Sequence, residues 1–313
     1  MDQQDSDYIY HLAVGSQGLA QRLAQLETDK ARKERKDRVV RKKVELLVAM
    51  YPKLAGLESA QLSALPSRIG RHEDADTRRT LLVDLTFSDP FAPYELKFKK
   101  SDMDDALGRV ASTLGLSAAD VASIRATQTA AARAHVAHSA IKIAAVGAGA
   151  AAVLATTAWF TVPIIAASIG AAAGLSGVAA TNFGMALLGG GSLAAGGFGM
   201  AGGMVVVTGV GAVAGFGGAS GAMVMMQIGA ARSKAELIKL QVTYKEVLLR
   251  NQADVAKAQS VVKNLATQHE ALRTQLDEER GLNDKNAARL KELEDTIEAV
   301  EHSLEWMHEQ RAA

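Results

Sequence analysis

The chain of 313 residues contains no cysteine, few aromatic residues and only five prolines. Without cysteine, disulfides and thiolate chemistry are excluded. The scarcity of aromatic residues and proline argues against a large β domain. The most extensive absence is that of charge, because the 89 residues between Lys142 and Arg232 include no Asp, Glu, Lys, Arg or His. Outside this block the sequence is rich in Ala, Leu, Glu, Lys, Arg and Gln, which predicts an all-α protein.

The chain is long enough for two or three domains, and its composition divides it into four regions. We expect a basic N-terminal helix over 1–51 and a small helical domain over 52–140. Residues 141–231 are predicted to form glycine-rich transmembrane helical hairpins, and 232–313 a coiled coil. The net charge of +1 gives no overall attraction to nucleic acid, so we expect no such partner. The acidic start of the sequence lacks the pattern of a secretory signal, which predicts synthesis in the cytoplasm.

A basic run lies in the first region, where nine of the fourteen residues from Lys30 to Lys43 are Lys or Arg. One interpretation is a solvated helix face, because Glu34 and Asp37 interrupt the run at helical spacing. The other is a patch for anionic lipid head groups. The candidate lipid-binding residues are Lys30, Arg32, Lys33, Arg35 and Lys36.

In the second region, helices are predicted over 77–87, 102–116 and 118–127, and Ser117 is the expected N-cap of the last one. Between about Leu81 and Ile124 the sequence "LLVDLTFSDPFAPYE…ALGRVASTLGLSAADVASI" resembles a TerB-like helical domain. The resemblance implies a sensing or docking module rather than an active site. The chain departs from the family at the acidic turn, where Ser88-Asp89-Pro90 replaces the usual Ala-Asp-Gly, and no site residue is carried over.

The uncharged block is long enough for up to four membrane-spanning helices. The expected spans are Ile141–Phe160, Val162–Ala180, Phe183–Val206 and Val207–Gly229. Basic residues lie on both flanks of the block, which favours the cytoplasmic side for both ends and an even number of spans, two or four. We therefore expect a protein of the inner (cytoplasmic) membrane with both soluble ends in the cytoplasm.

Glycine is concentrated in this block, which holds 21 of the 28 glycines. Hydrophobicity does not drive helices together in lipid, whereas small side chains let backbones approach closely. The predicted helix-packing residues are small and mostly four apart: Gly170, Gly174, Gly191, Ala195, Gly199, Gly203, Gly211 and Gly215. The block resembles the glycine zippers of bacterial membrane-perturbing effectors, including toxins and anti-phage defence proteins. That resemblance implies homo-oligomers that form pores in a lipid bilayer.

The last region shows apolar residues three or four apart, from Tyr244 through Val255 to Leu276 and again from Leu290 to Met307. This spacing predicts helix-on-helix pairing. Gly281 and the residues that follow favour a hairpin, while the preserved phase permits one continuous rod. Buried Asn251 and His269 are expected to fix the register, and the coiled coil is a candidate surface for a protein partner.

No catalytic motif is found, so we expect no enzyme and no cofactor. Gly197, Gly199 and Gly202 fit the G-x-G-x-x-G pattern, but no acidic residue follows until Glu236. His135 and His138 are three residues apart without a third ligand nearby, which predicts a structural role and no metal site.

Three functions compete on this basis. The first is a membrane-embedded oligomeric effector or channel-like protein that perturbs or permeabilises a membrane. The second is a non-toxic polytopic anchor whose coiled coil scaffolds partner proteins. The third is a soluble oligomer with a buried apolar core.

Overall fold

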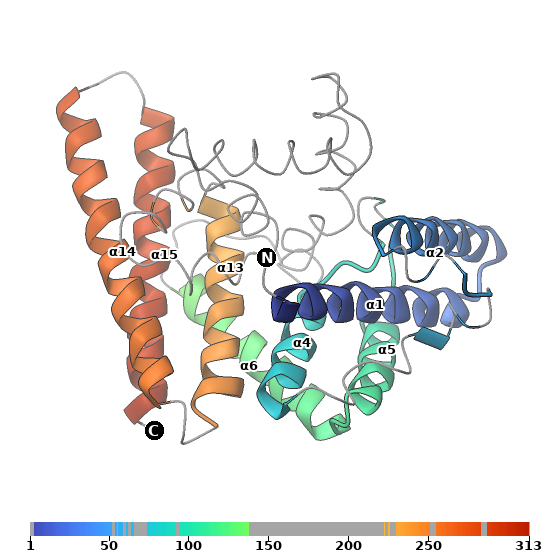
Figure 1. The fold of residues 1–313 in the computed structure, drawn as a ribbon. Helices are drawn as coiled ribbons and strands as arrows, with labels where there is room; N and C mark the ends of the chain where they lie inside the picture. Colours follow the sequence, from blue (N-terminus) through green and yellow to red (C-terminus); the bar gives the residue numbers. More distant parts are fainter. Residues whose placement is uncertain are drawn as a thin grey trace. The chain divides into compact units, whose positions relative to one another are not determined.

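A computed structural model shows an all-α chain in the part that it describes, with eight α-helices, one π-helix and no strand (Figure 1). The all-α prediction is confirmed for these residues. The described residues are 3–51, 54, 56–58, 61, 64, 65, 74–91, 94, 96–137, 222, 225, 230–250, 255–282 and 287–312.

The chain divides into two compact units. The described residues of the first unit lie within 3–125, and those of the second lie within 126–137 and 222–312. The basic N-terminal region therefore packs in the same unit as the helices expected over 77–127.

The first unit begins with α1 (Gln3–Leu26) and α2 (Lys30–Met50), which pack against each other. The sequence predicted one helical stretch here, and the structure breaks it at residues 27–29. The break is stabilised by Asp29, whose carboxylate accepts a hydrogen bond from the backbone N–H of Arg32 at 2.8 Å. An aspartate at this position satisfies an N–H that the helix itself leaves unpaired.

The other helices of this unit are α4 (Ala75–Thr86), α5 (Lys100–Thr113) and the first part of α6 (Ala118–Ala137). The predicted cap of α6 is confirmed, because Ser117 N–H donates to Asp120 Oδ2 at 2.8 Å and Asp120 N–H donates to Ser117 Oγ at 3.3 Å. These reciprocal bonds form a capping box. The helix starts where the sequence places it.

Helix α1 is the centre of this unit, since it packs on α2, α4 and α5 and is buried from Leu12 to Ala20. Its close approach to α4 depends on Gly15. A Cβ atom at Gly15 would lie 2.7 Å from Leu85 Cδ1, which is closer than van der Waals contact allows. Apolar burial along α1 and along residues 81–87 of α4 supplies the driving force for this packing.

The second unit contains α13 (Ala230–Thr243), the π-helix η4 (Tyr244–Leu248), α14 (Val255–Leu282) and α15 (Ala287–Ala312). Helix α15 packs against both α13 and α14. The expectation that Val255 is a core position is wrong, because its side chain is 48% exposed. A π-turn and the turn at residues 249–250 interrupt the 3.6-residue period, and Val255 then starts a new helix.

Helices α14 and α15 form an antiparallel hairpin, which settles the choice between a hairpin and a continuous rod (Figure 1). Near the turn, Arg289 Nη2 contacts Glu279 Oε1 at 2.8 Å and Arg280 Nη2 contacts Glu294 Oε1 at 2.6 Å. Further from the turn, His269 faces Glu301. As expected, His269 is buried in the hairpin.

None of the helices within the described residues combines the length and the apolar character that crossing a membrane requires. The four spans expected between Ile141 and Gly229 lie outside the described residues, apart from single positions near their end.

Candidate functional sites

The lipid-binding candidates on α2 have different environments. Lys30, Arg32 and Arg35 are exposed, and Lys33 is half-buried with its Nζ donating to the carbonyl of Ala24 at 2.9 Å. Lys36 is only 2% exposed, so it is not accessible to a lipid head group. We therefore leave Lys36 out of the proposal below.

Lys36 instead joins α2 to the rest of the first unit. Its Nζ lies 2.8 Å from Glu27 Oε2 and 5.5 Å from the centre of the Phe91 ring. The hydrogen bond from Lys36 lowers the pKa of Glu27 to about 2. A buried ammonium group needs such partners, because an isolated buried charge is strongly unfavourable.

Lys43 lies two turns further along the buried side of α2 and is fully enclosed. Burial lowers the pKa of Lys43 to about 7, and the negative charge of Asp89 opposes this shift. Asp89 belongs to the acidic turn after α4, where the sequence departs from the TerB-like pattern. The sequence analysis missed this pair, since nothing in the spacing links Lys43 to a residue after α4.

Other arginines of the first unit form ion pairs between helices. Arg22 of α1 contacts Asp105 of α5 at 2.5 Å, and Arg79 of α4 contacts Asp120 of α6 at 2.7 Å. Arg125 pairs with an acid of α5 in the same way. These ion pairs contribute to the packing of the helices, whereas six basic side chains of α2 are exposed.

The interior of the second unit contains polar side chains from α6, α13 and α15. His135 is fully buried, and its Nε2 lies 3.0 Å from Gln241 Oε1 and 3.3 Å from Ser303 Oγ. Lys234 Nζ donates to the backbone carbonyl of His135 at 3.0 Å. Burial lowers the pKa of His135 to about 4, which keeps the imidazole neutral at physiological pH.

A second buried polar contact joins the same elements. Thr127 of α6 donates its hydroxyl to Glu246 Oε1 of η4 at 2.6 Å. Together with His135, this bond fixes the second part of α6 against α13 and η4. The predicted structural role of His135 agrees with these contacts, whereas His138 lies outside the described residues.

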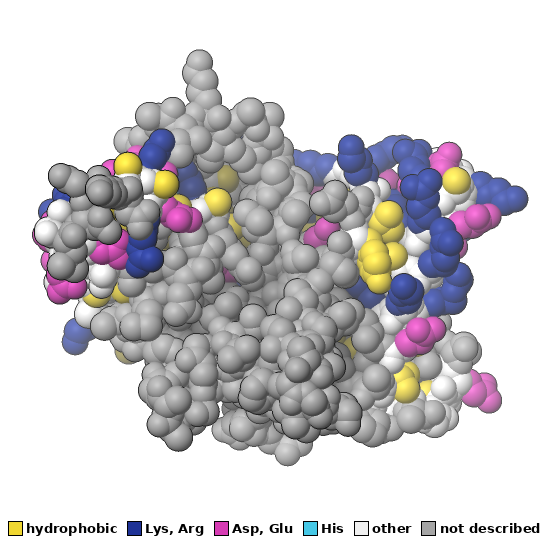
Figure 2. All heavy atoms as spheres, turned by 90° about the horizontal axis from the view of Figure 1, so that it is seen from above, with side chains coloured by type: hydrophobic (Ala, Val, Ile, Leu, Met, Phe, Trp, Pro, Cys, Tyr) yellow, Lys and Arg dark blue, Asp and Glu magenta, His cyan; other side chains and the backbone are white. Residues whose placement is uncertain are grey.

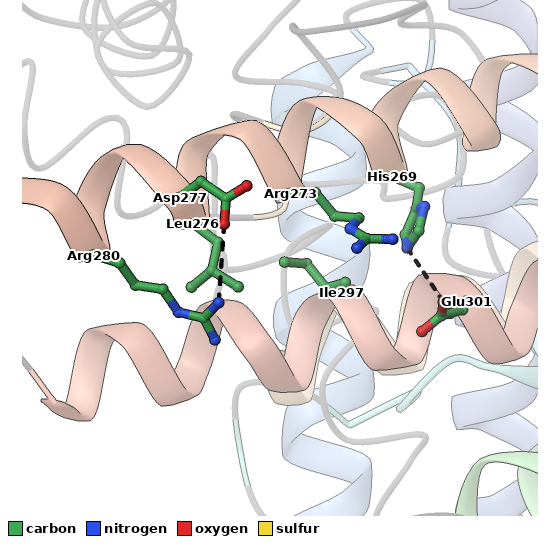
Figure 3. Close-up of a pocket in the computed structure, with 7 residues that line it drawn as sticks. All are labelled: His269, Arg273, Leu276, Asp277, Arg280, Ile297 and Glu301. Carbon is green, nitrogen blue, oxygen red and sulfur yellow. Dashed lines mark ion pairs between the residues drawn. The ribbon is translucent and has the colours of Figure 1, made fainter.

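A groove of about 240 Å³ lies between α14 and α15 (Figure 3). Its side chains include Arg273 and Arg280 as well as Asp277 and Glu301. Arg280 lies 3.9 Å from Asp277, and His269 Nε2 lies 3.9 Å from Glu301 Oε1. The lining carries two arginines and two carboxylates, so the groove has no charge of one sign to select a ligand.

Within the described residues, no group of three or more His, Asp or Glu side chains is arranged to hold a metal ion. The predicted helix-packing residues all lie outside the described part of the chain: Gly170, Gly174, Gly191, Ala195, Gly199, Gly203, Gly211 and Gly215. Their packing stays a prediction.

Comparison of the chain with protein-family models, with curated proteins and with solved structures gives no match. The TerB-like and glycine-zipper resemblances therefore stay predictions.

Proposed function

We propose that this chain is a non-enzymatic membrane effector that oligomerises through glycine-striped helices and makes a bilayer permeable. The observation that carries this proposal is the uncharged block of 89 residues with its stripe of small residues. In the sequence, this block lies between α6 of one helical region and α13 of the next. A role in bacterial toxin action or anti-phage defence follows from the glycine-zipper resemblance.

The physical argument concerns what holds helices together in lipid. Hydrocarbon tails surround an apolar helix as favourably as another apolar helix does, so association requires close van der Waals packing. In the proposed spans, Gly191, Gly199 and Gly203 leave the backbone uncovered on one side of the third helix, and Gly211 and Gly215 do so on the fourth. Such a surface fits a second copy of itself, which makes a homo-oligomer the expected assembly.

The proposed location is the cytoplasmic membrane, with both helical regions on the cytoplasmic side. Arg133 and Lys142 precede the uncharged block, and Arg232, Lys234 and Lys239 follow it. Basic residues at both flanks favour retention of both ends in the cytoplasm. This topology requires an even number of spans.

A second candidate function is a membrane anchor that scaffolds other proteins. The α14–α15 hairpin favours it, because its outer surface carries many exposed charged residues and a groove. A hairpin of this kind offers a surface for a partner helix. This function needs membrane insertion but no permeability change.

Induced expression with membrane fractionation separates these functions. The effector predicts growth arrest, carbonate-resistant membrane pelleting and cross-linked oligomers. It also predicts that Gly199→Leu abolishes growth arrest and oligomers without reducing expression. Gly197→Leu is the matched control, because Gly197 is the same residue type in the same segment but off the stripe. Pelleting without growth arrest would favour the anchor, and a soluble chain would contradict both.

A further inference from the structure

Helix α2 carries six exposed basic residues against two exposed acids, Glu34 and Glu45. Arg32 lies 3.5 Å from Glu27 and 3.7 Å from Asp29. The other five form no ion pair within the described part of the chain. The six are Lys30, Arg32, Arg35, Arg38, Arg41 and Lys42.

Five of these positions share one side of the helix, whereas Arg32 lies in line with the buried residues. At 100° per residue, the buried side of α2 is marked by Lys36, Val39 and Lys43, and Arg38 and Arg41 lie opposite to it. The interhelical ion pairs of this unit use arginines on other helices, such as Arg22. The exposed basic side chains of α2 thus take no part in the ion pairs that join the helices of this unit.

The structure brings a second basic segment beside this helix. Lys42 Nζ lies 5.5 Å from the centre of the Tyr94 ring, and Lys36 lies equally far from the Phe91 ring. The Phe91 and Phe98 rings are 6.2 Å apart. Phe91 and Tyr94 therefore contact α2, and the exposed residues Lys97, Lys99 and Lys100 follow them closely in the chain.

Local helix stability does not explain these lysines. Lys99 is the N-cap of α5 and makes no capping hydrogen bond with its side chain. The N-terminus of a helix carries a partial positive charge, so Lys99 and Lys100 are in an unfavourable position there. Residues that local structure disfavours, exposed beside another basic surface, indicate a role in binding.

We propose that α2 and the segment from Tyr94 to Lys100 form one basic face that docks on anionic lipid head groups. The basic face consists of Lys30, Arg35, Arg38, Arg41 and Lys42 of α2 together with Lys97, Lys99, Lys100 and Tyr94. This inference rests on the proposed membrane function and names the lipid class that the chain selects. Figure 2 shows Lys and Arg side chains gathered on the side of the molecule formed by α2, around a small hydrophobic patch.

A membrane surface fits the chemistry of this face. Clustered Lys and Arg side chains bind the phosphates of anionic lipids, each contributing independently of exact geometry. Tyr94 is 37% exposed at the edge of the cluster, and tyrosine is favoured at head-group depth. The same chain carries the uncharged block that we propose to insert, so the face would hold the first unit against the bilayer that surrounds that block.

The test compares binding of the full chain to two kinds of vesicle. One is phosphatidylcholine alone, and in the other about a third of the lipid is phosphatidylglycerol. One variant combines Arg35→Gln, Arg38→Gln and Arg41→Gln, and another combines Lys97→Gln, Lys99→Gln and Lys100→Gln. The control combines Lys263→Gln, Lys291→Gln and Arg311→Gln, which removes the same charge from exposed positions of α14 and α15. We expect each basic-face variant to lower the preference for anionic vesicles by on the order of 100-fold at low salt, and the control to keep it.

Three results would overturn the proposal: equal loss in the control, no loss from the lysine variant, or tighter binding of the wild-type chain to duplex DNA or RNA than to anionic vesicles at equal phosphate concentration. Lys99→Ser adds a check on folding, because it supplies a cap and should raise the Tm while it weakens anionic-vesicle binding. A lower Tm together with weaker binding to anionic vesicles would contradict the assignment of Lys99 to the basic face.

The outcome is separable from that of the membrane function. Gly199→Leu is expected to abolish leakage and to keep the anionic preference. The basic-face variants are expected to lose that preference and to keep leakage of neutral vesicles at high protein concentration. Anionic preference without any leakage would leave the basic face standing and contradict the effector.

Discussion

His135 and Gln241 meet in the interior of the second unit, where the imidazole Nε2 lies 3.0 Å from the amide Oε1 although the residues are 106 positions apart. Ser303 approaches the same nitrogen from α15 at 3.3 Å. The His135 Nδ1 atom has no hydrogen-bond partner within the described residues. One buried neutral imidazole thus ties α6, α13 and α15 together.

This burial predicts that the second unit loses stability in mild acid. An unfolded histidine titrates near pH 6.5, whereas burial lowers the pKa of His135 to about 4. Between these values the unfolded chain binds a proton that the folded chain does not, so stability is complete above pH 6.5 and falls as the pH decreases toward 4. The expected loss is on the order of 2–3 kcal/mol. Urea unfolding followed by circular dichroism measures it.

His135→Gln provides the comparison, since glutamine does not titrate. We expect the variant to be less stable at pH 7 because the packing around the imidazole changes. Its stability should vary less between pH 6.5 and 4 than that of the wild type. An unchanged pH dependence would show that other groups cause the acid sensitivity.

Lys43→Met is predicted to stabilise the first unit most at or below neutral pH. The pKa of Lys43 is lowered to about 7 by burial, so below pH 7 the folded chain must enclose a charge. Between pH 7 and 10.5 only the unfolded chain stays protonated, and wild-type stability rises with pH. The lowered pKa means that the charged lysine costs the folded chain several kcal/mol relative to the unfolded chain. Met removes this cost, and Asp89 is only half-buried. A variant less stable than wild type at pH 6 would contradict this prediction.

Gly15→Ala is predicted to destabilise the first unit, because its Cβ atom would lie 2.7 Å from Leu85 Cδ1. Overpacking costs about 1–3 kcal/mol, which exceeds the gain of about 1 kcal/mol from better helix propensity. In a Leu85→Ala background the same change should become favourable. If the effects of the two substitutions are additive, α1 and α4 move apart easily enough to accommodate the added methyl group.

Gly108→Ala is the matched control in α5, because nothing lies within 4 Å of the added Cβ atom. Here the helix propensity acts alone, and we expect stabilisation by about 0.5–1 kcal/mol. Thermal unfolding of both alanine variants gives the comparison. Destabilisation at Gly108 would indicate a contact that the packing of α5 does not account for.

The helices that sequence reasoning predicted well are those with local signals. Ser117 and Asp120 mark the start of α6, and the helices predicted over 77–87 and 102–116 lie close to α4 and α5. The break before α2 also had a local signal in Asp29, which was overlooked. The exposure of Val255 could not be predicted from spacing, because a π-turn changes the period without a distinct residue pattern.

The sites were less predictable than the helices, since they depend on contacts between distant residues. The basic run suggested that Lys36 faces solvent, whereas Glu27 and Phe91 enclose it. The Lys36–Phe91 and Lys42–Tyr94 contacts, which spacing does not predict, attach the segment after α4 to α2. The role of His135 likewise depends on Gln241, which lies far away in the sequence.

Dye release from liposomes tests the central claim most directly. We expect the purified wild-type chain to release a trapped dye, and Gly199→Leu or Gly203→Leu to reduce the rate at least about tenfold, because the bulky side chain separates the packed backbones. Gly197→Leu should leave release near the wild-type rate. Equal release from wild type and both stripe variants would contradict the account.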